Sequence, residues 1–312
     1  MIYNVSIRTD IVNYYTPWLL NRLKEGYVYS RNPYDKHQVS KFDLRPEQVD
    51  AMIFCSKNYK PLLDHIDKIN KNYNILCQYT ITAYGKDVEP NVPSIDESIE
   101  TLTELSEIIG KERIAWRYDP ILITDNYTID DHLETFEYIA SEINNYINYS
   151  IFSFVDMYRK VKINMPEIIP FTREDTQYII KHLGKIANKY GIPIQTCLIN
   201  EDLTKYGIRN SACVTTKILE EANNIKFRKI KHIGLRDGCR CVPTHDFGTY
   251  NTCPNQCKYC YANRNQRLAK NNYKLHNPES PLLLGKITEK DKITQSKNKR
   301  LLLRDSKQTV LF

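Results

Sequence analysis

The chain has 312 residues, 41% of them hydrophobic, which is enough for one large domain or two smaller ones around a buried core. Its sequence contains no run of about 18 apolar residues, so we expect no membrane span and no membrane partner. The first residues lack the basic-then-apolar order of a signal peptide, and we therefore expect a cytoplasmic location.

The formal net charge of +7 is unevenly distributed. Residues 258–312 contain 13 Lys or Arg and 4 Asp or Glu, so all of the net positive charge comes from this C-terminal segment, which begins at the end of the cysteine-rich region. A basic C-terminal segment either contacts phosphate groups or forms a solvated tail. We expect a basic tail over residues 276–312 and keep nucleic acid as a candidate partner.

Short β-rich segments alternate with helical segments along residues 1–225. Six segments are rich in Val, Ile, Tyr, Phe or Thr and are bounded by polar residues, as is typical of strands: 2–8, 51–56, 75–82, 114–119, 150–156 and 192–198. Three helix starts between them have the spacing of a capping box: Ser94 with Glu97, Thr128 with Asp131, and Thr172 with Asp175.

Six β-then-α units in series predict a parallel sheet, because each parallel pair of strands needs a crossover connection. We therefore predict an α/β fold in which residues 1–225 form a partial (βα)6 TIM-like barrel. Residues 226–275 follow as a cysteine-rich segment with little periodicity. We expect a metal, more than a hydrophobic core, to order this segment on the mouth of the barrel.

The nine cysteines are concentrated late in the chain, since seven of them lie between Cys197 and Cys260. The cytoplasm keeps thiols reduced, so this clustering indicates metal ligation and not disulfides. The other two, Cys55 and Cys77, lie inside strand patterns and are expected in the core.

The motif Cys253-Pro-Asn-Gln-Cys257-Lys-Tyr259-Cys260 separates three cysteines by three and then two residues. Three such thiolates can bind one iron each of a cubic 4Fe–4S cluster and leave the fourth iron open to a non-protein ligand. The alternative is structural zinc, which usually has paired Cys-x-x-Cys hooks. The spacing, with an aromatic residue before the third cysteine, is similar to the radical SAM signature. That resemblance implies a 4Fe–4S cluster, S-adenosyl-L-methionine, and a reductant such as ferredoxin or flavodoxin.

Longer motifs resemble a bacterial family described only as domain of unknown function 1848. They are residues 239–263 and the shorter stretches 8–11, 54–58, 78–82, 116–120 and 276–281. The resemblance covers nearly the whole chain and implies a radical-SAM-like cluster at its C-terminal end. Cys55 and Ser56 stand where the family pattern has Trp and Thr. The Gly-Gly-Glu type motif common in radical SAM proteins is missing.

Polar residues stand at or just beyond the predicted carboxyl ends of the strands, where a β/α barrel places its active site. Arg117 and Asp119 share one face of their strand, with Trp116 and Tyr118 on the other. Arginine suits a carboxylate and aspartate suits an ammonium group or ribose hydroxyls, which are the polar parts of S-adenosylmethionine. Ordinary salt bridges are the alternative. We predict that this cofactor contacts Arg8, Asp10, Lys57, Arg117, Asp119 and Asp156.

Four further cysteines, Cys197, Cys213, Cys239 and Cys241, are sufficient to bind a second iron–sulfur cluster or a zinc ion. The alternative is a pair of small buried thiols with two incidental cysteines. His245, between the two cysteine groups, is either a proton-transfer residue or a hydrogen-bonded turn residue.

Two functions are compatible with these patterns. The first is a radical-SAM-like 4Fe–4S enzyme that reductively cleaves S-adenosylmethionine and acts on an unknown substrate, with no catalytic residue assigned. The second is an iron–sulfur protein that binds or repairs nucleic acid through the basic C-terminal segment. An electron carrier is disfavoured, because carriers normally ligate all four irons with protein thiolates.

Overall fold

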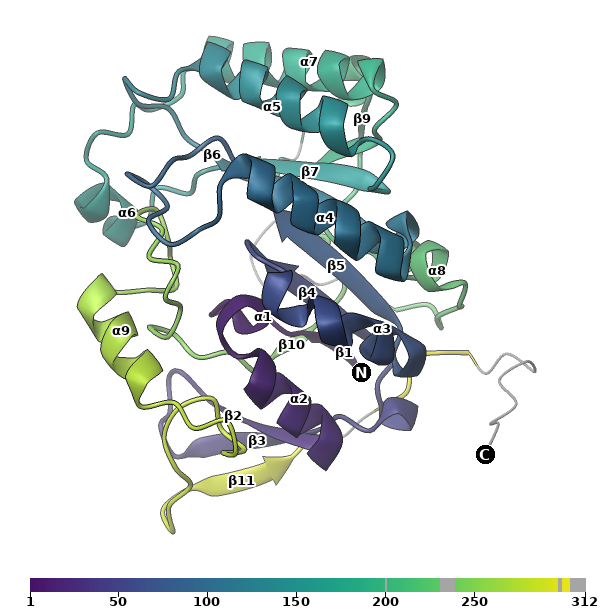
Figure 1. The fold of residues 1–312 in the computed structure, drawn as a ribbon, viewed down its shortest axis with the longest axis vertical. Helices are drawn as coiled ribbons and strands as arrows, with labels where there is room; N and C mark the ends of the chain where they lie inside the picture. The colour runs from purple at the N-terminus through teal and green to yellow at the C-terminus, as the bar shows by residue number, and fades with distance from the viewer. Residues whose placement is uncertain (200, 231–238, 297–298, 304–312) are drawn as a thin grey trace.

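The computed structural model describes residues 1–199, 201–230, 239–296 and 299–303. Its centre is an eight-stranded sheet in the order β10-β1-β4-β5-β6-β7-β8-β9, and every neighbouring pair is parallel (Figure 1). The bounds are β1 Ile2–Asn4, β4 Ala51–Ser56, β5 Ile75–Thr80, β6 Ile114–Ile121, β7 Tyr149–Phe154, β8 Ile194–Thr196, β9 Ile208–Arg209 and β10 His245–Asp246.

The parallel α/β architecture predicted from the sequence is confirmed, because all six predicted strands lie in this sheet. The first is shorter than predicted and ends at Asn4. The two-residue strands β9 and β10 are too short to have a sequence pattern, and they form the two edges of the sheet. Closure of the sheet into a barrel stays a prediction.

Helices connect the strands. They are α1 Ile11–Tyr14, α2 Thr16–Glu25, α3 Leu63–Asn72, α4 Ile95–Ile109, α5 Ile129–Ile143, α6 Arg159–Asn164, α7 Arg173–Lys189, α8 Thr216–Asn223 and α9 Gln266–Lys274. All three predicted capping boxes are present, at the starts of α4, α5 and α7. In each box the side chains of the cap residue and of the third helical residue satisfy backbone N–H groups that the first turn leaves unpaired.

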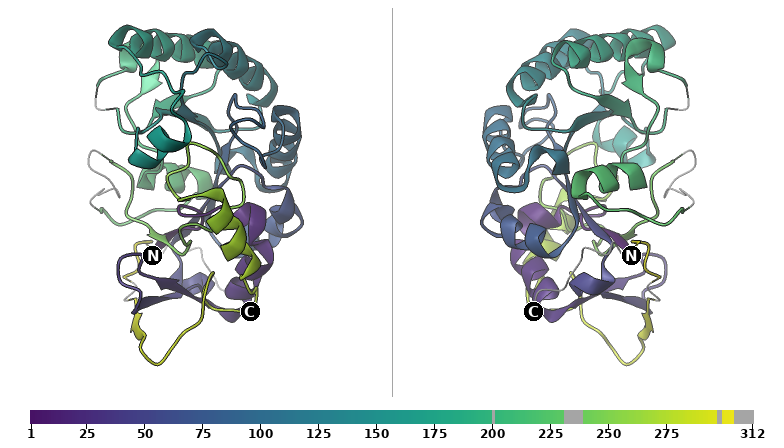
Figure 2. Two further views of the ribbon diagram at one scale, coloured as in Figure 1. Left: turned by 90° about the vertical axis from the view of Figure 1, so that its left-hand side faces the viewer. Right: turned by 90° about the vertical axis from the view of Figure 1, so that its right-hand side faces the viewer.

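The two faces of the sheet pack against different layers (Figures 1 and 2). Helices α3, α4, α5 and α7 cover one face, where Trp116 and Tyr118 of β6 are buried among them. Helix α8 and the chain around Cys213 and Val242 cover the other face. Strand residues alternate between the two faces, so Arg117 of β6 belongs to the second face.

A smaller, three-stranded sheet is built from two strands near the start of the chain and one near its end. Strands β2 (Tyr27–Arg31) and β3 (Gln38–Asp43) are antiparallel, and β11 (Lys292–Gln295) pairs in parallel with β3. The segment expected to be a basic tail therefore contributes a strand. Residues 304–312 of that segment lie outside the described residues. Across the described part of the chain, no helix is both long and apolar enough to cross a membrane.

Helix α7 touches the turn before β9 at a glycine. A Cβ atom on Gly184 would lie 2.1 Å from the carbonyl oxygen of Tyr206, closer than any two such atoms can approach. The absent side chain therefore allows the helix to lie directly against this turn and to hold the edge strand β9 in place.

We expect Gly184→Ala to lower the free energy of unfolding by about 1–3 kcal/mol, because the added methyl group must push the turn away. Chemical denaturation followed by circular dichroism measures this change. Lys185→Ala is the matched control on the exposed side of the same helix, and its effect should stay within about 0.5 kcal/mol. Equal stability of the two variants would contradict the close contact.

Candidate functional site

Asp10 is a buried carboxylate that ties three segments together. It accepts hydrogen bonds from the backbone N–H of Asn13 at 3.0 Å, the Ser56 hydroxyl at 2.7 Å and the backbone N–H of Lys57 at 3.1 Å. The Asn255 amide, in the cysteine segment, donates to it at 3.0 Å. Burial raises the pKa of Asp10, although these hydrogen bonds oppose the shift. Asp10 thus fixes the cysteine segment to the carboxyl end of β4.

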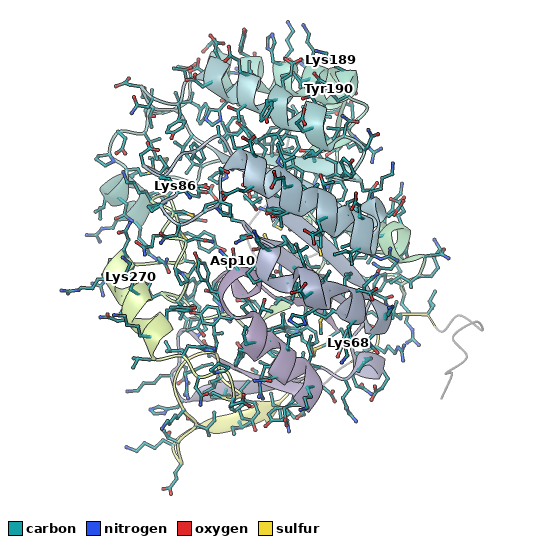
Figure 3. The ribbon with its side chains drawn as sticks, in the orientation of Figure 1. Asp10, Lys68, Lys86, Lys189, Tyr190 and Lys270 are labelled. Carbon is teal, nitrogen blue, oxygen red and sulfur yellow. The ribbon has the colours of Figure 1, made fainter. Side chains whose placement is uncertain are left out.

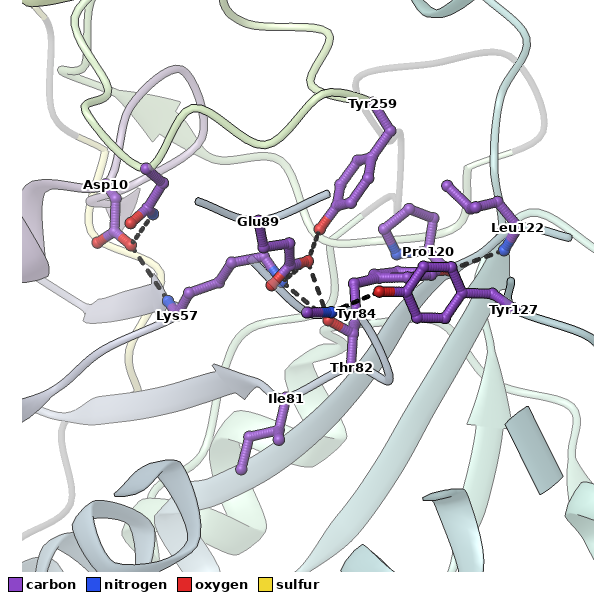
Figure 4. A network of polar contacts seen from close by, with 12 residues as sticks. Asp10, Lys57, Ile81, Thr82, Tyr84, Glu89, Pro120, Leu122, Tyr127 and Tyr259 are labelled. Carbon is purple, nitrogen blue, oxygen red and sulfur yellow. Dashed lines mark hydrogen bonds and ion pairs between the residues drawn. The ribbon is translucent and has the colours of Figure 1, made fainter. Parts of the chain in front are cut away.

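Glu89, in the loop between β5 and α4, accepts three donors through one carboxylate oxygen (Figure 4). Lys57 Nζ lies 2.8 Å from this oxygen, the Thr82 hydroxyl donates at 2.9 Å, and the Tyr259 hydroxyl donates as well. Burial alone would lower the pKa of Lys57, but Glu89 and the Cys257 thiol raise it above its ordinary value. Lys57 and Glu89 therefore form a largely buried ion pair, with side chains 11% and 2% exposed.

The sulfurs of Cys253, Cys257 and Cys260 are close enough to interact electrostatically with one another, and that of Cys257 also interacts with Lys57 and Glu89 of this ion pair. Burial raises the pKa of Cys257, and the Glu89 carboxylate adds to the effect, whereas the Lys57 ammonium opposes it. The pKa of Cys253 is also raised, by burial and by Asp10. Burial also raises the pKa of Cys260, so the pKa of each of the three thiols lies above that of an ordinary cysteine.

Arg117 and Asp119 form a second ion pair on β6, each side chain 18% exposed. Arg117 also donates to the Gln78 side chain at 3.0 Å, and the Ser153 hydroxyl donates to Asp119. Burial would raise the pKa of Asp119, but Arg117 lowers it, with help from Ser153 and Lys57. Asp119 therefore lies between two cationic side chains.

The other two predicted cofactor contacts are placed differently. Arg8 pairs with Asp246 through its Nε and donates to the Ser30 hydroxyl at 3.2 Å, which is the ordinary salt bridge that the sequence left open. Asp156 is exposed, and the Tyr158 hydroxyl lies 3.4 Å from it. Four of the six predicted residues, Asp10, Lys57, Arg117 and Asp119, thus gather in the interior with the three cysteines. Asp10 lies at the centre of the view in Figure 3.

Glu89 was not predicted as a site residue, because the cofactor contacts were sought among polar residues at the ends of strands. It lies in the loop nine residues beyond Thr80, the last residue of β5. No local pattern marks it. The ring centroids of His245 and Phe42 lie 5.2 Å apart, and this contact favours a structural role for His245.

The remaining four cysteines also lie together, on the second face of the sheet. Cys197 follows β8, Cys213 follows β9, and Cys239 and Cys241 come from the cysteine segment; all four line one cavity. Hydrogen bonding with Cys197, and then with Cys241, raises the pKa of Cys213. Hydrogen bonding with Cys213 lowers the pKa of Cys241, and Cys239 adds to this effect.

Neither cysteine group is arranged as a formed ion site. Within the described ranges, no group of three or more His, Cys, Asp or Glu side chains already stands in a geometry that encloses one metal ion. The metal ligation predicted for these seven cysteines therefore stays a prediction.

The fold and the site define an α/β protein with a parallel sheet and a late, cysteine-rich segment on its carboxyl end. The model of a family described as "Domain of unknown function (DUF1848)" matches residues 2–262, and the chain belongs to this family. No curated protein matches the chain. Among solved structures, the chain is similar to the FimX EAL domain of Xanthomonas citri in complex with c-diGMP. The identity is 11% and the TM-score 0.20, over 63% of this chain and 89% of that chain.

We expect Asp10→Ala to lower the free energy of unfolding by about 1–3 kcal/mol or more, because buried donors of Ser56, Lys57 and Asn255 lose their acceptor. Denaturant unfolding measures the loss. Asp67→Ala is the control, since that exposed carboxylate pairs only with Lys71 one turn away on α3. Its effect should not exceed about 0.5 kcal/mol. A small effect of Asp10→Ala would show that Asp10 does not fix the cysteine segment.

Proposed function

We propose that the protein is a radical-SAM-like enzyme in which Cys253, Cys257 and Cys260 bind a 4Fe–4S cluster with one open iron. One observation carries the proposal. The three neighbouring thiols lie at the carboxyl end of a parallel sheet, beside the Lys57–Glu89 ion pair. This end is where β/α folds place their active sites.

The position of the motif in space supports the proposal. Strand β10 precedes the motif by only a few residues and pairs in parallel with β1. It is therefore the first strand of the sheet in spatial order, although it comes late in the sequence. Radical SAM proteins usually carry their three cysteines after the first strand of the barrel, and a motif that follows the strand beside β1 supports the comparison.

The donor set fits such a cluster. Three thiols from one short loop match the three protein ligands that leave one iron open. Asn255 anchors the loop to Asp10, and the Asn263 side chain donates to the Cys253 carbonyl oxygen at 2.8 Å. These hydrogen bonds hold the loop in shape from both ends of the motif. When bound and reduced, the cluster supplies the electron that breaks a C–S bond of S-adenosylmethionine, giving methionine and a 5′-deoxyadenosyl radical.

The surrounding side chains suit the polar groups of S-adenosylmethionine. Lys57 lies next to Cys257 and offers positive charge where thiolate ligands add negative charge. Arg117 donates to Asp119 and to Gln78, and its remaining N–H groups can donate to a carboxylate while these partners are kept. Asp119 offers a carboxylate to an ammonium group or to ribose hydroxyls. The substrate and the physiological reductant, such as ferredoxin or flavodoxin, are left open by these residues.

Nucleic-acid binding is the second candidate function, and helix α9 is the observation that favours it. The helix and the residues just before it expose four basic side chains: Arg264, Arg267, Lys270 and Lys274. Tyr273 on the same helix is 39% exposed. Basic residues next to an aromatic ring suit single-stranded nucleic acid, whose binding weakens as salt rises. Salt-dependent binding of a single strand, lost when these four residues are changed to Ala, is the corresponding measurement.

We expect the variant in which Cys253, Cys257 and Cys260 are all Ala to lose about four irons per chain, the content of one cubane. The measurement is iron and sulfide content after anaerobic reconstitution, together with 5′-deoxyadenosine formed from S-adenosylmethionine under reduction. The wild type should form 5′-deoxyadenosine and the variant should not. Cys77→Ala, which changes a buried core thiol of β5, is the control and should keep its iron.

Zinc as the sole metal at these cysteines in iron-replete, anaerobic protein would refute the cluster. Full iron content without any 5′-deoxyadenosine would refute only the cleavage of S-adenosylmethionine.

We expect Arg117→Gln to weaken binding of S-adenosylmethionine about 10- to 100-fold, since a hydrogen bond to a charged group contributes about 1.5–3 kcal/mol. Calorimetry on the reconstituted protein gives the dissociation constant. Arg45→Gln is the control, because that exposed guanidinium pairs with Asp43 at the end of β3 in the smaller sheet. Equal weakening in both variants would place the cofactor elsewhere. Circular dichroism of each variant establishes that the fold is kept.

A further inference from the structure

We propose that Cys197, Cys213, Cys239 and Cys241 form a second metal site, which binds one Zn²⁺ ion through four thiolates. This site is separate from the proposed cluster and does not depend on it. It lies against α8, beyond the carboxyl ends of β8 and β9, whereas the cluster motif contacts Asp10 and Glu89 beside the carboxyl ends of β4 and β5.

The four thiols come from three segments and meet in one place. Cys197 leaves the sheet at β8, Cys213 leaves it after β9, and the pair Cys239 and Cys241 arrives from the cysteine segment. Backbone contacts hold the segments together, since the N–H of Val242 donates to the carbonyl oxygen of Val214 at 3.0 Å. The fold, and not local chain geometry, therefore brings the four thiols to one cavity.

The space between the sulfurs suits one ion better than a cubane. The cavity that they line has a volume of about 10 Å³, close to that of a single water-sized sphere. Tetrahedral zinc–thiolate bonds of about 2.3 Å place the four sulfurs roughly 3.8 Å apart around a single ion. Ligands of a 4Fe–4S cluster stand further apart, around four irons and four sulfides.

The surroundings of the sulfurs are also those of a thiolate site. Four thiolates around Zn²⁺ carry a net charge of −2, and Arg117 is an electrostatic neighbour of both Cys197 and Cys213. Arg240 lines the same cavity. Positive charge therefore stands on two sides of the site, one arginine in the interior and one at the surface.

Ion binding requires the four thiols to move towards one another, because they do not yet enclose an ion. The thiol contacts run as a chain, and the two ends of the chain, Cys197 and Cys239, are themselves electrostatic neighbours. Bringing these ends towards a common centre converts the chain into a tetrahedron and releases the thiol protons. The result would clamp the cysteine segment to the ends of β8 and β9, where the edge of the sheet is formed by a two-residue strand.

The test uses the full chain in which Cys253, Cys257 and Cys260 are Ala, so that iron at the proposed cluster cannot interfere. We expect this protein, produced with both metals in the medium and purified anaerobically, to contain one zinc per chain. X-ray absorption should give four sulfur ligands at about 2.3 Å. Further change of Cys239 and Cys241 to Ala should abolish the zinc, whereas Cys77→Ala in the same background should retain it.

Replacement of the zinc by Co²⁺ provides a second readout on protein with all four cysteines intact, in case the variant lacking two of them does not fold. Tetrahedral thiolate ligation gives intense visible absorption and a sulfur-to-cobalt charge-transfer band. Iron and sulfide in cluster stoichiometry in the test background would overturn the proposal. So would a disulfide between any two of the four, detected by mass spectrometry without reduction, or a zinc content near zero. The iron content of the wild type tests the cluster separately, so failure of one proposal leaves the other measurable.

Discussion

Two largely buried ion pairs, Lys57 with Glu89 and Arg117 with Asp119, control the arrangement of the carboxyl end of the sheet. An isolated ion in a protein interior costs several kcal/mol, so each charge here must keep its partner. Lys57 and Glu89 come from different segments of the chain, whereas Arg117 and Asp119 both stand on β6. Tyr259 of the cysteine segment donates to Glu89. Packing of the cysteine segment and pairing of the charges therefore depend on each other.

The charged side chains of these ion pairs form one row between the two groups of cysteines. Cys257 is an electrostatic neighbour of Lys57, and Lys57 in turn influences Asp119. Asp119 pairs with Arg117, which is an electrostatic neighbour of Cys213. One cation thus lies next to each thiol group, with an anion between them. Thiolates formed at either group would gain a compensating positive charge without new groups entering the interior.

Features with local causes could be read from the sequence. The capping boxes at Ser94, Thr128 and Thr172 are short motifs whose hydrogen bonds lie within four residues, and all three are present. The six strands follow from short β-rich patterns in the same way. Their parallel order follows from the crossover that each connection provides.

Features with distant causes could not be read in this way. Arg8 and Arg117 look alike in the sequence, but Asp246, more than 200 residues away, pairs with only one of them. Glu89 lies in a loop, and its role arises from Lys57 and Tyr259. The edge strand β10 consists of two residues, and only its pairing with β1 reveals it. In each case the partner that gives the residue its place lies far along the chain.

The pairing of β10 with β1 explains how a motif late in the sequence reaches the carboxyl end of the sheet. In a parallel sheet all strands point the same way. The chain that leaves β10 therefore emerges at the carboxyl end of the sheet, as does the chain that leaves β1, β4, β5 and β6. Cys253 follows Asp246 by seven residues, a length that spans at most about 25 Å when extended. Within that reach, the bonds from Asn255 to Asp10 and from Tyr259 to Glu89 hold the motif at the carboxyl end of the sheet.

The direction of this edge strand is consequently a structural requirement of the site. An antiparallel strand at the same position would release the cysteine loop at the opposite end of the sheet, away from Asp10, Lys57 and Glu89. The register Tyr3 to His245 and Asn4 to Asp246 fixes the direction through only two residue pairs. The Arg8–Asp246 ion pair and the bond from Arg8 to the Asp246 carbonyl oxygen add to these contacts. The position of the cysteine loop thus depends on Asp246, a residue outside the motif.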